Sequence, residues 1–593
     1  MTWAGSLPVA ALVAWPLTWL AGAVVTYNVL SLLAPAFSAW TGFLLARYLT
    51  RDTLAALVGG YFFGFSSYQL GRMLGHLNLG LVFAVPLLVL FALQRFKGDL
   101  SRTRFVASLA IALLVQLGLS TEILATACVL GALTWLVFLL YAFPEDRLRL
   151  WALAREIVLA AAIMAVLAAP FLYFVLKGLR NLSGQINSPE AFSANLLNYV
   201  VPTPLTLIGG GFFANVAHRL NGNMTEQGAY LGLPLILILV LHFRDRRVHP
   251  YIKPLLVSLV AILILSLGPS LHFAGVATGI WLPWRLTLHL PLIHQALPTR
   301  LSMYVALAAG LTAALWLSSA RSGLERAGRF TLAMLACVCL VPKPIAARWT
   351  ALPIQPFFEP ENVVRSLGRD ANVLIFPYGY AGPSMIWQWQ SGMRFSQSGG
   401  YLGPTPPSTA TLPAVKSFYT GVVGPDFAND ISGFCVAHKV SAILIAPGTP
   451  ETLVDALHSL NWDTANDHGI QIVRVPNQNS LCFHYIAGDY WPLDKWMGKQ
   501  VNVVVRGQSM RLRISGRDRP PQVGPVEVRI VNGSNVARYQ IGSQDTQVVR
   551  LPPDCSVTVT ASATWEPEPD TRAISVHVSL EPDVGGVEGT SNL

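Results

Sequence analysis

The sequence predicts an α-helical polytopic membrane protein of about 10–11 spans, followed by a C-terminal extracytoplasmic α/β domain and an all-β sandwich. Composition is the first observation: 53% of the 593 residues are hydrophobic, only 12% are charged, and the mean hydropathy is +0.49. A globular protein has roughly 25% charged residues. The other two observations are the spacing of basic residues between apolar stretches and a change of composition after Pro342.

The first apolar stretch, residues 6–25, contains Pro8 and Pro16 and ends near Gly22. Its start lacks the basic segment of a signal peptide, so we do not expect it to be cleaved. Two alternatives stay open: the stretch spans the bilayer, or it lies in the outer face as a half-helix.

Ten further stretches are apolar and long enough to span, allowing for tilt. They are residues 28–46, 53–69, 79–96, 104–119, 121–142, 152–176, 228–243, 253–272, 298–319 and 327–342.

Basic residues fill every second gap between these stretches. One set of gaps holds Arg47, Arg51, Arg95, Lys97, Arg102, Arg104, Arg147, Arg149, Arg155, Arg244, Arg246, Arg247, Lys253, Arg321, Arg326 and Arg329. The other, longer set holds Arg72, Lys177, Arg180, Arg219, Arg285 and Arg300. The positive-inside rule places the first set in the cytoplasm. Everything after about Pro342 is then expected outside it.

The outer loops differ in length, which indicates where function should be sought. Residues 71–78 and 118–122 are short, 273–297 is intermediate, and 177–227 is long and rich in Gly, Pro and aromatic residues. The long loops are typical of a folded cap over a polar vestibule.

After Pro342 the pattern becomes that of a water-soluble protein. Helices are expected at 360–368, 427–438 and 450–460, and strands at 372–377, 440–446 and 470–475. From about Val501 short alternating strands follow, such as VNVVV, MRLRIS and VEVRIV, which are typical of a sandwich. We therefore predict a transmembrane domain (1–342), an extracytoplasmic α/β domain (343–490) and an extracytoplasmic β-sandwich (491–593).

Cysteine and tryptophan leave alternatives open in these outer domains. One disulfide, Cys435 with Cys482, would suit an oxidising compartment. Trp491, Trp496 and Trp565 could bind carbohydrate, although packing is the usual fate of tryptophan.

Glu122 is the first candidate functional residue, because it stands where two spans meet with almost no loop. A carboxylate there faces a watery cavity or a cation, or else it belongs to a capped first helical turn after Ser120 and Thr121. His76 and Asn78, in a polar outer turn, are candidates for binding a ligand or are simply solvated. Arg72, four residues before His76, favours an anionic ligand.

Arg300 stands where the chain re-enters the membrane, at the start of a helix. A cation there opposes the helix dipole and so needs an anion nearby, and together with free backbone N–H groups it suits a phosphate. The alternative is an arginine that snorkels to lipid headgroups. Glu226 and Gln227 contact a sugar or, more economically, cap the next helix.

Several function classes are excluded by the motifs. The sequence has no Walker A motif, no GxGxxG after a strand, no HExxH and no GxSxG. Nucleic-acid binding is not expected, because the basic residues lie beside spans, where topology explains them.

The chain resembles bacterial multi-pass membrane glycosyltransferases of the GT-C type over roughly residues 20–320. The resemblance is carried by YNVLSLLAPAFSAWTGFLLARYLT, AALVGGYFFGFSSYQLGRMLGHLNL, EQGAYLGLP, LGPSLHF and LPTRLSMY. It implies a location in the bacterial inner membrane, a polyprenyl-phosphate-linked sugar donor, inversion at the anomeric carbon and an extracytoplasmic glycan or protein acceptor. Arg300, with Arg72 or Arg285, would then hold the phosphate, and Glu122 would be a supporting carboxylate or a ligand of a divalent cation, which no residue here requires.

The chain departs from this family at its start, because no Asp or Glu precedes Asp52, where such enzymes carry an acidic outer loop. We expect a protein that lacks its first span and catalytic loop. The alternative is a non-catalytic membrane protein that carries or binds lipid-linked saccharide or assists envelope glycan assembly. Charges near the bilayer centre would favour a carrier, whereas here they cluster at span ends, which favours the transferase.

Overall fold

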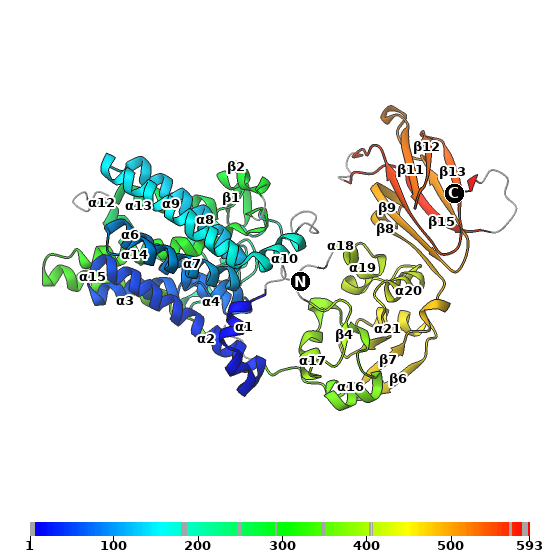
Figure 1. The fold of residues 1–593 in the computed structure, drawn as a ribbon, viewed down its shortest axis with the longest axis horizontal. Coiled ribbons are helices and arrows are strands. Elements are labelled where there is room, and N and C mark those ends of the chain that lie inside the picture. Colours follow the sequence, from blue (N-terminus) through cyan, green and yellow to red (C-terminus); the bar gives the residue numbers. More distant parts are fainter. Residues whose placement is uncertain are drawn as a thin grey trace. The chain divides into compact units, whose positions relative to one another are not determined.

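The computed structural model divides the chain into two compact units, Met1–Thr350 and Ala351–Leu593 (Figure 1). It describes residues 6–179, 187–245, 252–290, 293–344, 350–401, 405, 407–567, 572–583 and 591–592. The first unit is helical and the second is rich in β-sheet, which confirms the predicted order of parts. The further division of the second part at residue 490 stays a prediction.

The first unit is built from helices that differ widely in length. They are α1 (Pro8–Val13), α2 (Trp15–Thr50), α3 (Thr53–Gly64), α4 (Ser67–Arg72), α5 (Leu77–Gly80), α6 (Ala84–Lys97), α7 (Arg102–Leu119), α8 (Thr121–Tyr141), α9 (Pro144–Leu167), α10 (Ala169–Leu179), α11 (Ala214–Ala217), α12 (Leu233–Arg244), α13 (Ile252–Ser266), α14 (Ser302–Ser318) and α15 (Gly323–Cys339). Among the described residues, six helical segments are long and apolar enough to cross a membrane, and four apolar helices are shorter. The protein is therefore a multi-pass membrane protein, while the count of 10–11 spans stays a prediction.

Several helix boundaries differ from those expected. The predicted span 53–69 is broken after Gly64, because Ser66 caps a new short helix, α4. The predicted span 152–176 is two helices, α9 and α10, interrupted at Ala168. Because α9 already begins at Pro144, Arg147, Arg149 and Arg155 lie on a helix and not in a loop.

Two other helices also differ from the expected spans at their boundaries. Arg326 and Arg329, expected in a loop, lie within α15. The predicted span 253–272 ends at Ser266 and continues into a β-hairpin, β1 (Ser270–Phe273) and β2 (Val276–Trp281). The first stretch is helical on both sides of Gly22, whose backbone leaves the helical region.

Close helix packing in the first unit depends on small residues. A Cβ at Gly60 would lie 2.5 Å from the carbonyl oxygen of Ala39, so α3 and α2 touch through their backbones. A Cβ at Gly310 would lie 2.6 Å from the carbonyl oxygen of Gly59, which brings α14 equally close to α3. Small residues at such crossings are the usual way in which membrane helices gain contact.

The long segment between α10 and α12 folds as a cap, as the sequence predicted. From Asn187 to Gly232 it contains short 3-10 turns and the single turn α11. The buried Tyr199 anchors it to α13, because its hydroxyl lies 2.6 Å from Ser266 Oγ. Residues 180–186, including Arg180, lie outside the described residues.

The second unit begins with a mixed sheet of five strands in the order β4-β3-β5-β7-β6. The strands are β3 (Asn372–Phe376), β4 (Ser396–Gln397), β5 (Ala442–Ile445), β6 (Thr464–Asp467) and β7 (Ile470–Arg474). The strands β4, β3 and β5 are parallel, and β6 and β7 are antiparallel. Its helices are α16 (Pro360–Leu367), α17 (Ser384–Gln390), α18 (Pro407–Ala410), α19 (Pro413–Thr420), α20 (Phe427–Ala437) and α21 (Glu451–His458).

The rest of the unit is one hydrogen-bonded sheet of nine strands. They are β8 (Phe483–Trp491), β9 (Trp496–Arg506), β10 (Met510–Ser515), β11 (Val526–Asn532), β12 (Asn535–Ile541), β13 (Thr546–Leu551), β14 (Cys555–Ala561), β15 (His577–Pro582) and β16 (Ser591–Asn592). Alternate residues face a shared core, as in β10, where Met510, Leu512 and Ile514 are buried. The all-β character is confirmed, whereas the strands join one sheet rather than two separate ones.

The open questions on cysteine and tryptophan are answered in part. Cys435 is buried, Cys482 is exposed, and both are free. Trp496 is buried against Trp565 and His577, with ring centroids 5.0 and 3.7 Å away. Packing therefore accounts for this tryptophan.

Candidate functional site

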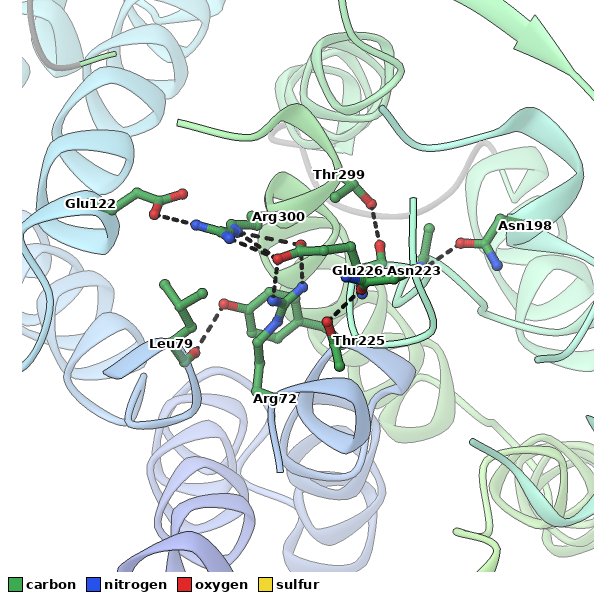
Figure 2. A network of polar contacts seen from close by, with 11 residues as sticks. Arg72, Leu79, Glu122, Asn198, Asn223, Thr225, Glu226, Thr299 and Arg300 are labelled. Atoms are coloured by element: carbon green, nitrogen blue, oxygen red, sulfur yellow. Dashed lines mark hydrogen bonds and ion pairs between the residues drawn. The ribbon is translucent and has the colours of Figure 1, made fainter. Parts of the chain in front are cut away.

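Four charged side chains that lie far apart in the sequence meet at one end of the helical unit (Figure 2). Arg72 donates two parallel hydrogen bonds to Glu226, Nη1 to Oε1 at 2.7 Å and Nη2 to Oε2 at 2.6 Å. Arg300 Nη2 donates to Glu226 Oε1 at 2.7 Å, and Arg300 Nη1 donates to Glu122 Oε2. We call Arg72, Glu122, Glu226 and Arg300 the quartet. The sequence singled out all four but could not bring them together.

Each member of the quartet stands at the end of a helix or in the cap. Arg72 ends α4, and Glu122 lies in the first turn of α8. Ser120 caps α8, because its Oγ accepts a hydrogen bond from the backbone N–H of Ile123 at 3.3 Å. Arg300 lies in a short 3-10 turn, Pro298–Leu301, directly before α14. The two alternatives for Glu122 are thus both realised: it belongs to a capped first turn, and it faces a cation.

The backbone on either side of Glu226 is fixed by hydrogen bonds. Asn223 Oδ1 accepts from the Glu226 N–H at 3.2 Å, and Thr299 Oγ1 donates to the Glu226 carbonyl oxygen at 2.8 Å. Asn198 Oδ1 accepts from the backbone N–H of Ala229 at 3.1 Å. The cap and the turn before α14 therefore both fix the backbone that carries the Glu226 carboxylate.

Two glycines let the cap approach α4 closely. A Cβ at Gly71 would lie 2.7 Å from the carbonyl oxygen of Thr225. A Cβ at Gly228 would lie 2.6 Å from the Cα of Tyr68. Any larger residue at either position would push the cap away from the helix and Glu226 away from Arg72.

Burial divides the quartet into an inner and an outer pair. The side chains of Arg72 and Glu226 are 1% and 3% exposed, whereas those of Arg300 and Glu122 are 14% and 23% exposed. Burial raises the pKa of Glu226, but the guanidiniums of Arg72 and Arg300 outweigh this and lower it to about 2. The two positive and two negative charges cancel, which is what makes their burial tolerable.

Two polar atoms of the quartet keep unused hydrogen-bonding capacity. Among the described residues, Glu122 Oε1 and Arg72 Nε are buried and have no hydrogen-bond partner. Arg72 also lies over the ring of Tyr68, 4.9 Å from its centroid, and the Tyr68 hydroxyl donates to the Leu79 carbonyl oxygen at 2.9 Å. An aromatic face therefore supports Arg72 on the side that the carboxylate does not occupy.

The other predicted residues lie near the quartet or apart from it. His76 is half-buried and lies close to Arg72, because its backbone N–H donates to the Arg72 carbonyl oxygen at 2.9 Å. Burial first, and then the charge of Arg72, lower its pKa. Within the described part of the chain, neither His76 nor Asn78 has a side-chain hydrogen bond to the quartet. Arg285 is exposed and stacks on Trp281, with its guanidinium 4.1 Å from the ring centroid. The expectation that Arg285 joins Arg300 is not met.

Helix capping by Glu226 and Gln227, the more economical alternative, was wrong. The next helix, α12, begins at Leu233, six residues after Gln227. Gln227 Nε2 instead donates to the carbonyl oxygens of Leu220 and Gly222, both at 3.2 Å, and so closes the cap on itself. Arg72 is also too buried in this arrangement to contact a ligand directly, contrary to the role expected for it.

Sequence reasoning missed the uncharged residues that hold the site. Asn198, Asn223 and Thr299 fix the backbone around Glu226 (Figure 2). Their only signal in the sequence is a position near a loop end, which most Asn and Thr residues share.

A family model with the description "Domain of unknown function (DUF6311)" matches residues 1–341. A search of curated proteins found no match. Among solved structures, the chain is similar to the arabinofuranosyltransferase AftD from Mycobacteria, with 11% identity and a TM-score of 0.47 over 94% of this chain and 52% of that one. It is also similar to ArnT from Cupriavidus metallidurans in the apo state, with 13% identity and a TM-score of 0.41 over 79% of this chain and 88% of that one.

The same ArnT bound to undecaprenyl phosphate matches at 15% identity, with a TM-score of 0.35 over 80% of this chain and 89% of that one. The chain spans about half of the length of the AftD structure that it matches.

Proposed function

The chain belongs to the DUF6311 family, and we propose that it is a membrane glycosyltransferase of the GT-C type that moves a sugar from a polyprenyl-phosphate donor to an extracytoplasmic acceptor. The observation that carries this proposal is the quartet. In it, the partly exposed pair of Arg300 and Glu122 is held in place by the buried pair of Arg72 and Glu226. Buried charges are costly, and membrane proteins keep them mainly where they act.

Arg300 is the residue we assign to the donor phosphate. It is the more exposed of the two arginines, and its planar guanidinium matches the geometry of phosphate oxygens. Its Nη1, however, already donates to Glu122. A phosphate therefore binds by exchange: one of its oxygens replaces the Glu122 carboxylate on Nη1, while Glu226 keeps its hold on Nη2.

Arg72 is a positioning residue in this proposal. It neutralises Glu226 and fixes it, and Glu226 in turn orients Arg300. The pKa of about 2 keeps Glu226 charged at every physiological pH, so this support does not titrate away.

The exchange leaves Glu122 with a charge and a free oxygen next to the reacting sugar. In the transfer, a bond forms between the acceptor oxygen and the anomeric carbon, and the bond from that carbon to the phosphate oxygen breaks. The electron pair leaves with the polyprenyl phosphate, which Arg300 stabilises. The proton of the acceptor hydroxyl passes to a carboxylate, and Glu122 is our candidate because the exchange releases its Oε2 from Arg300 Nη1.

A divalent cation is a further expectation that the site supports only weakly. No group of three or more His, Cys, Asp or Glu side chains that could hold a metal ion occurs in the described ranges. Glu122 alone could contribute one ligand, so no step is assigned to a metal.

The hairpin β1–β2 offers a surface suited to lipid. Phe273, Val276, Ile280 and Trp281 are 51–72% exposed. A tryptophan stacked with an arginine, here Trp281 with Arg285, is typical of the membrane–water interface, where one end of the pair is apolar and the other is wet. A polyprenyl chain approaching from the bilayer would meet such a surface before it met solvent.

The orientation proposed for the site rests on the positive-inside rule. The quartet lies at the end that carries few basic residues, and the basic loops lie at the other. We therefore propose that the site and the second unit lie outside the cytoplasm of a bacterial inner membrane, where a glycan or protein acceptor would be available.

The test compares variants of the full chain in nanodiscs, with undecaprenyl phosphate as the probe and native mass spectrometry as the readout. Glu122→Gln removes the competing carboxylate, so we expect it to bind the probe about tenfold more tightly, a gain of roughly 1.4 kcal/mol. Arg300→Lys keeps the positive charge but loses the planar guanidinium with its paired N–H donors, so this variant should bind undecaprenyl phosphate more weakly. Arg326→Ala, which changes an exposed arginine far from the quartet, is the matched control.

The same variants are then assayed for sugar transfer from synthetic polyprenyl-phosphate sugars. Glu122→Gln should lose transfer although it binds the donor lipid better. Weaker binding by Glu122→Gln, or unchanged transfer, would contradict the exchange.

A non-catalytic protein that carries or binds lipid-linked saccharide is the second candidate. The observation in its favour is that the four charges already cancel within the protein. In that case the Glu122→Gln variant would bind the probe more tightly, and no donor would be turned over by the wild type.

A further inference from the structure

A cluster of tyrosines lies at one edge of the five-stranded sheet in the second unit. The parallel strands β3 and β4 end at Phe376 and Gln397, and the chain leaves both at the same edge. The segment after β3 carries Tyr378 and Tyr380, and the segment after β4 carries Tyr401. Ligands of open α/β sheets bind outside the carboxyl ends of the parallel strands, which is where these segments lie.

Two of the tyrosines are exposed and arranged as a floor and a wall. Tyr380 is 68% exposed and Tyr401 is 54% exposed. One face of the Tyr380 ring lies on Tyr419 of α19, with centroids 5.2 Å apart and planes 19° apart. The Tyr401 ring stands at 78° to Tyr380, with centroids 6.1 Å apart. Among the described residues, no second ring stacks on the other face of Tyr380, which lies beside the upright ring of Tyr401.

We call the exposed rings of Tyr380 and Tyr401 the platform. The residues beneath it are closely packed. Tyr419 makes a T-shaped contact with the buried Tyr378, with ring centroids 5.0 Å apart, and its hydroxyl lies 3.0 Å from Thr405 Oγ1. Gly399 has a positive φ of 98°, and a Cβ there would collide with the Tyr378 ring. A platform fixed from below loses little entropy when a ligand binds on top of it.

We propose that Tyr380 and Tyr401 form a binding site for a neutral saccharide. Residues 377–383 and 398–401 contain no charged residue, so these two segments offer a charged ligand no ion pair. An exposed tyrosine offers an apolar ring face and a hydroxyl that donates and accepts hydrogen bonds. A sugar ring matches both, since it presents a face of C–H groups and a rim of hydroxyls.

The choice of saccharide rests on the proposed function, in which the acceptor outside the cytoplasm is a glycan or a protein, and this site would suit the glycan. A proline-rich peptide is the competing ligand, because extended proline segments also dock on aromatic residues. Those grooves use several parallel aromatic ridges, whereas this platform offers a single open face and one wall.

The test uses the full chain in nanodiscs and isothermal titration with maltohexaose, xylohexaose and mannohexaose as probes. We expect at least one probe to bind with a dissociation constant in the millimolar range or tighter. Tyr380→Ala should weaken this binding about tenfold, because stacking on an aromatic ring supplies roughly 1.4 kcal/mol. Tyr380→Trp, which enlarges the ring face, should keep or strengthen it.

Leu493→Ala is the matched control, because Leu493 is 97% exposed in the same unit and should leave binding unchanged. Binding of none of the three probes, or binding that Tyr380→Ala leaves intact, would overturn the proposal, and so would capture of a proline-rich peptide by the same tyrosines. Glu122→Gln should not change saccharide binding, so a failure of the transfer reaction and a failure of this site give different results.

Discussion

The two ends of the helical unit both carry arginine–carboxylate pairs, yet they place them in different surroundings. The helix α7 shows that these are opposite ends, because it begins at Arg102 near the basic residues and ends at Leu119 next to the quartet, about 27 Å away at 1.5 Å per residue. At the basic end, Arg326 pairs with Asp52 at 2.8 Å and Arg95 with Glu156 at 2.6 Å. At the other end, Arg72 pairs with Glu226 at 2.6 Å.

The length of an ion pair therefore says little about what the pair does. The side chains of Arg326 and Asp52 are 47% and 16% exposed, and those of Arg72 and Glu226 are 1% and 3% exposed. The Arg95–Glu156 pair lies between them, at 28% and 8%. Exposed pairs are worth about 0–1 kcal/mol because water and salt screen them. In a buried pair, removing one partner leaves a bare charge, which costs about 3–5 kcal/mol. The site end is therefore the one at which charge must be conserved.

The largest effect is expected from Arg300→Ala, which leaves Glu122 and Glu226 with one arginine between them. We expect the free energy of unfolding to fall by about 3–5 kcal/mol, measured as a lower midpoint of thermal unfolding. Adding Glu122→Gln to Arg300→Ala should restore part of this loss, because the carboxylate that loses its arginine is then replaced by a neutral amide. A loss below about 1 kcal/mol would mean that the quartet behaves like an exposed pair.

The next effect is a dependence of stability on pH at the site end. The pKa of Glu226 is about 2 in the folded protein against 4.5 for an unperturbed glutamate. A carboxyl with a lowered pKa stabilises the protein above its unfolded pKa, and this stability is lost as pH falls through the folded pKa. We expect wild-type stability to decline from about pH 4.5 toward pH 2.

Glu226→Gln should be less stable than the wild type at neutral pH and should lack the part of the acid slope that belongs to this residue. The measurement is the midpoint of thermal unfolding across that pH range. Equal slopes in both proteins would show that Glu226 is not the group that titrates.

Much of the fold could be predicted because it depends on local patterns. The helix expected at 427–438 is α20, Phe427–Ala437, and the strand expected from MRLRIS is β10, Met510–Ser515. Apolar periodicity and alternation are properties of neighbouring residues, so they survive in one sequence. The edge strand β12, Asn535–Ile541, was not among the strands predicted from the sequence.

The site could be predicted only as a set of separate residues. Glu122, Glu226 and Arg300 were each noticed as charges at span ends, which is a local observation. Their pairing depends on the path of the cap, and this path is fixed by contacts such as Thr299 with the Glu226 backbone. No pattern within a short segment encodes such a contact. The same reason explains why Arg285 was grouped with Arg300 although it stacks on Trp281.

The smallest effect on the free energy of unfolding is expected from Arg326→Ala at the basic end, because this arginine is exposed. Its partner Asp52 also caps α3 and keeps these contacts in the variant. Asp52 Oδ1 accepts hydrogen bonds from the backbone N–H groups of Leu54 and Ala55 at 3.0 and 3.1 Å. Losing an exposed arginine therefore leaves no bare buried charge, and the free energy of unfolding should change by no more than about 1 kcal/mol. The change should also shrink more in high salt than that of Arg300→Ala, since Arg326 is 47% exposed and Arg300 only 14%. If Arg326→Ala were as damaging as Arg300→Ala at any salt concentration, burial would not be what distinguishes the two ends, and the case for the quartet as a functional site would lose its physical basis.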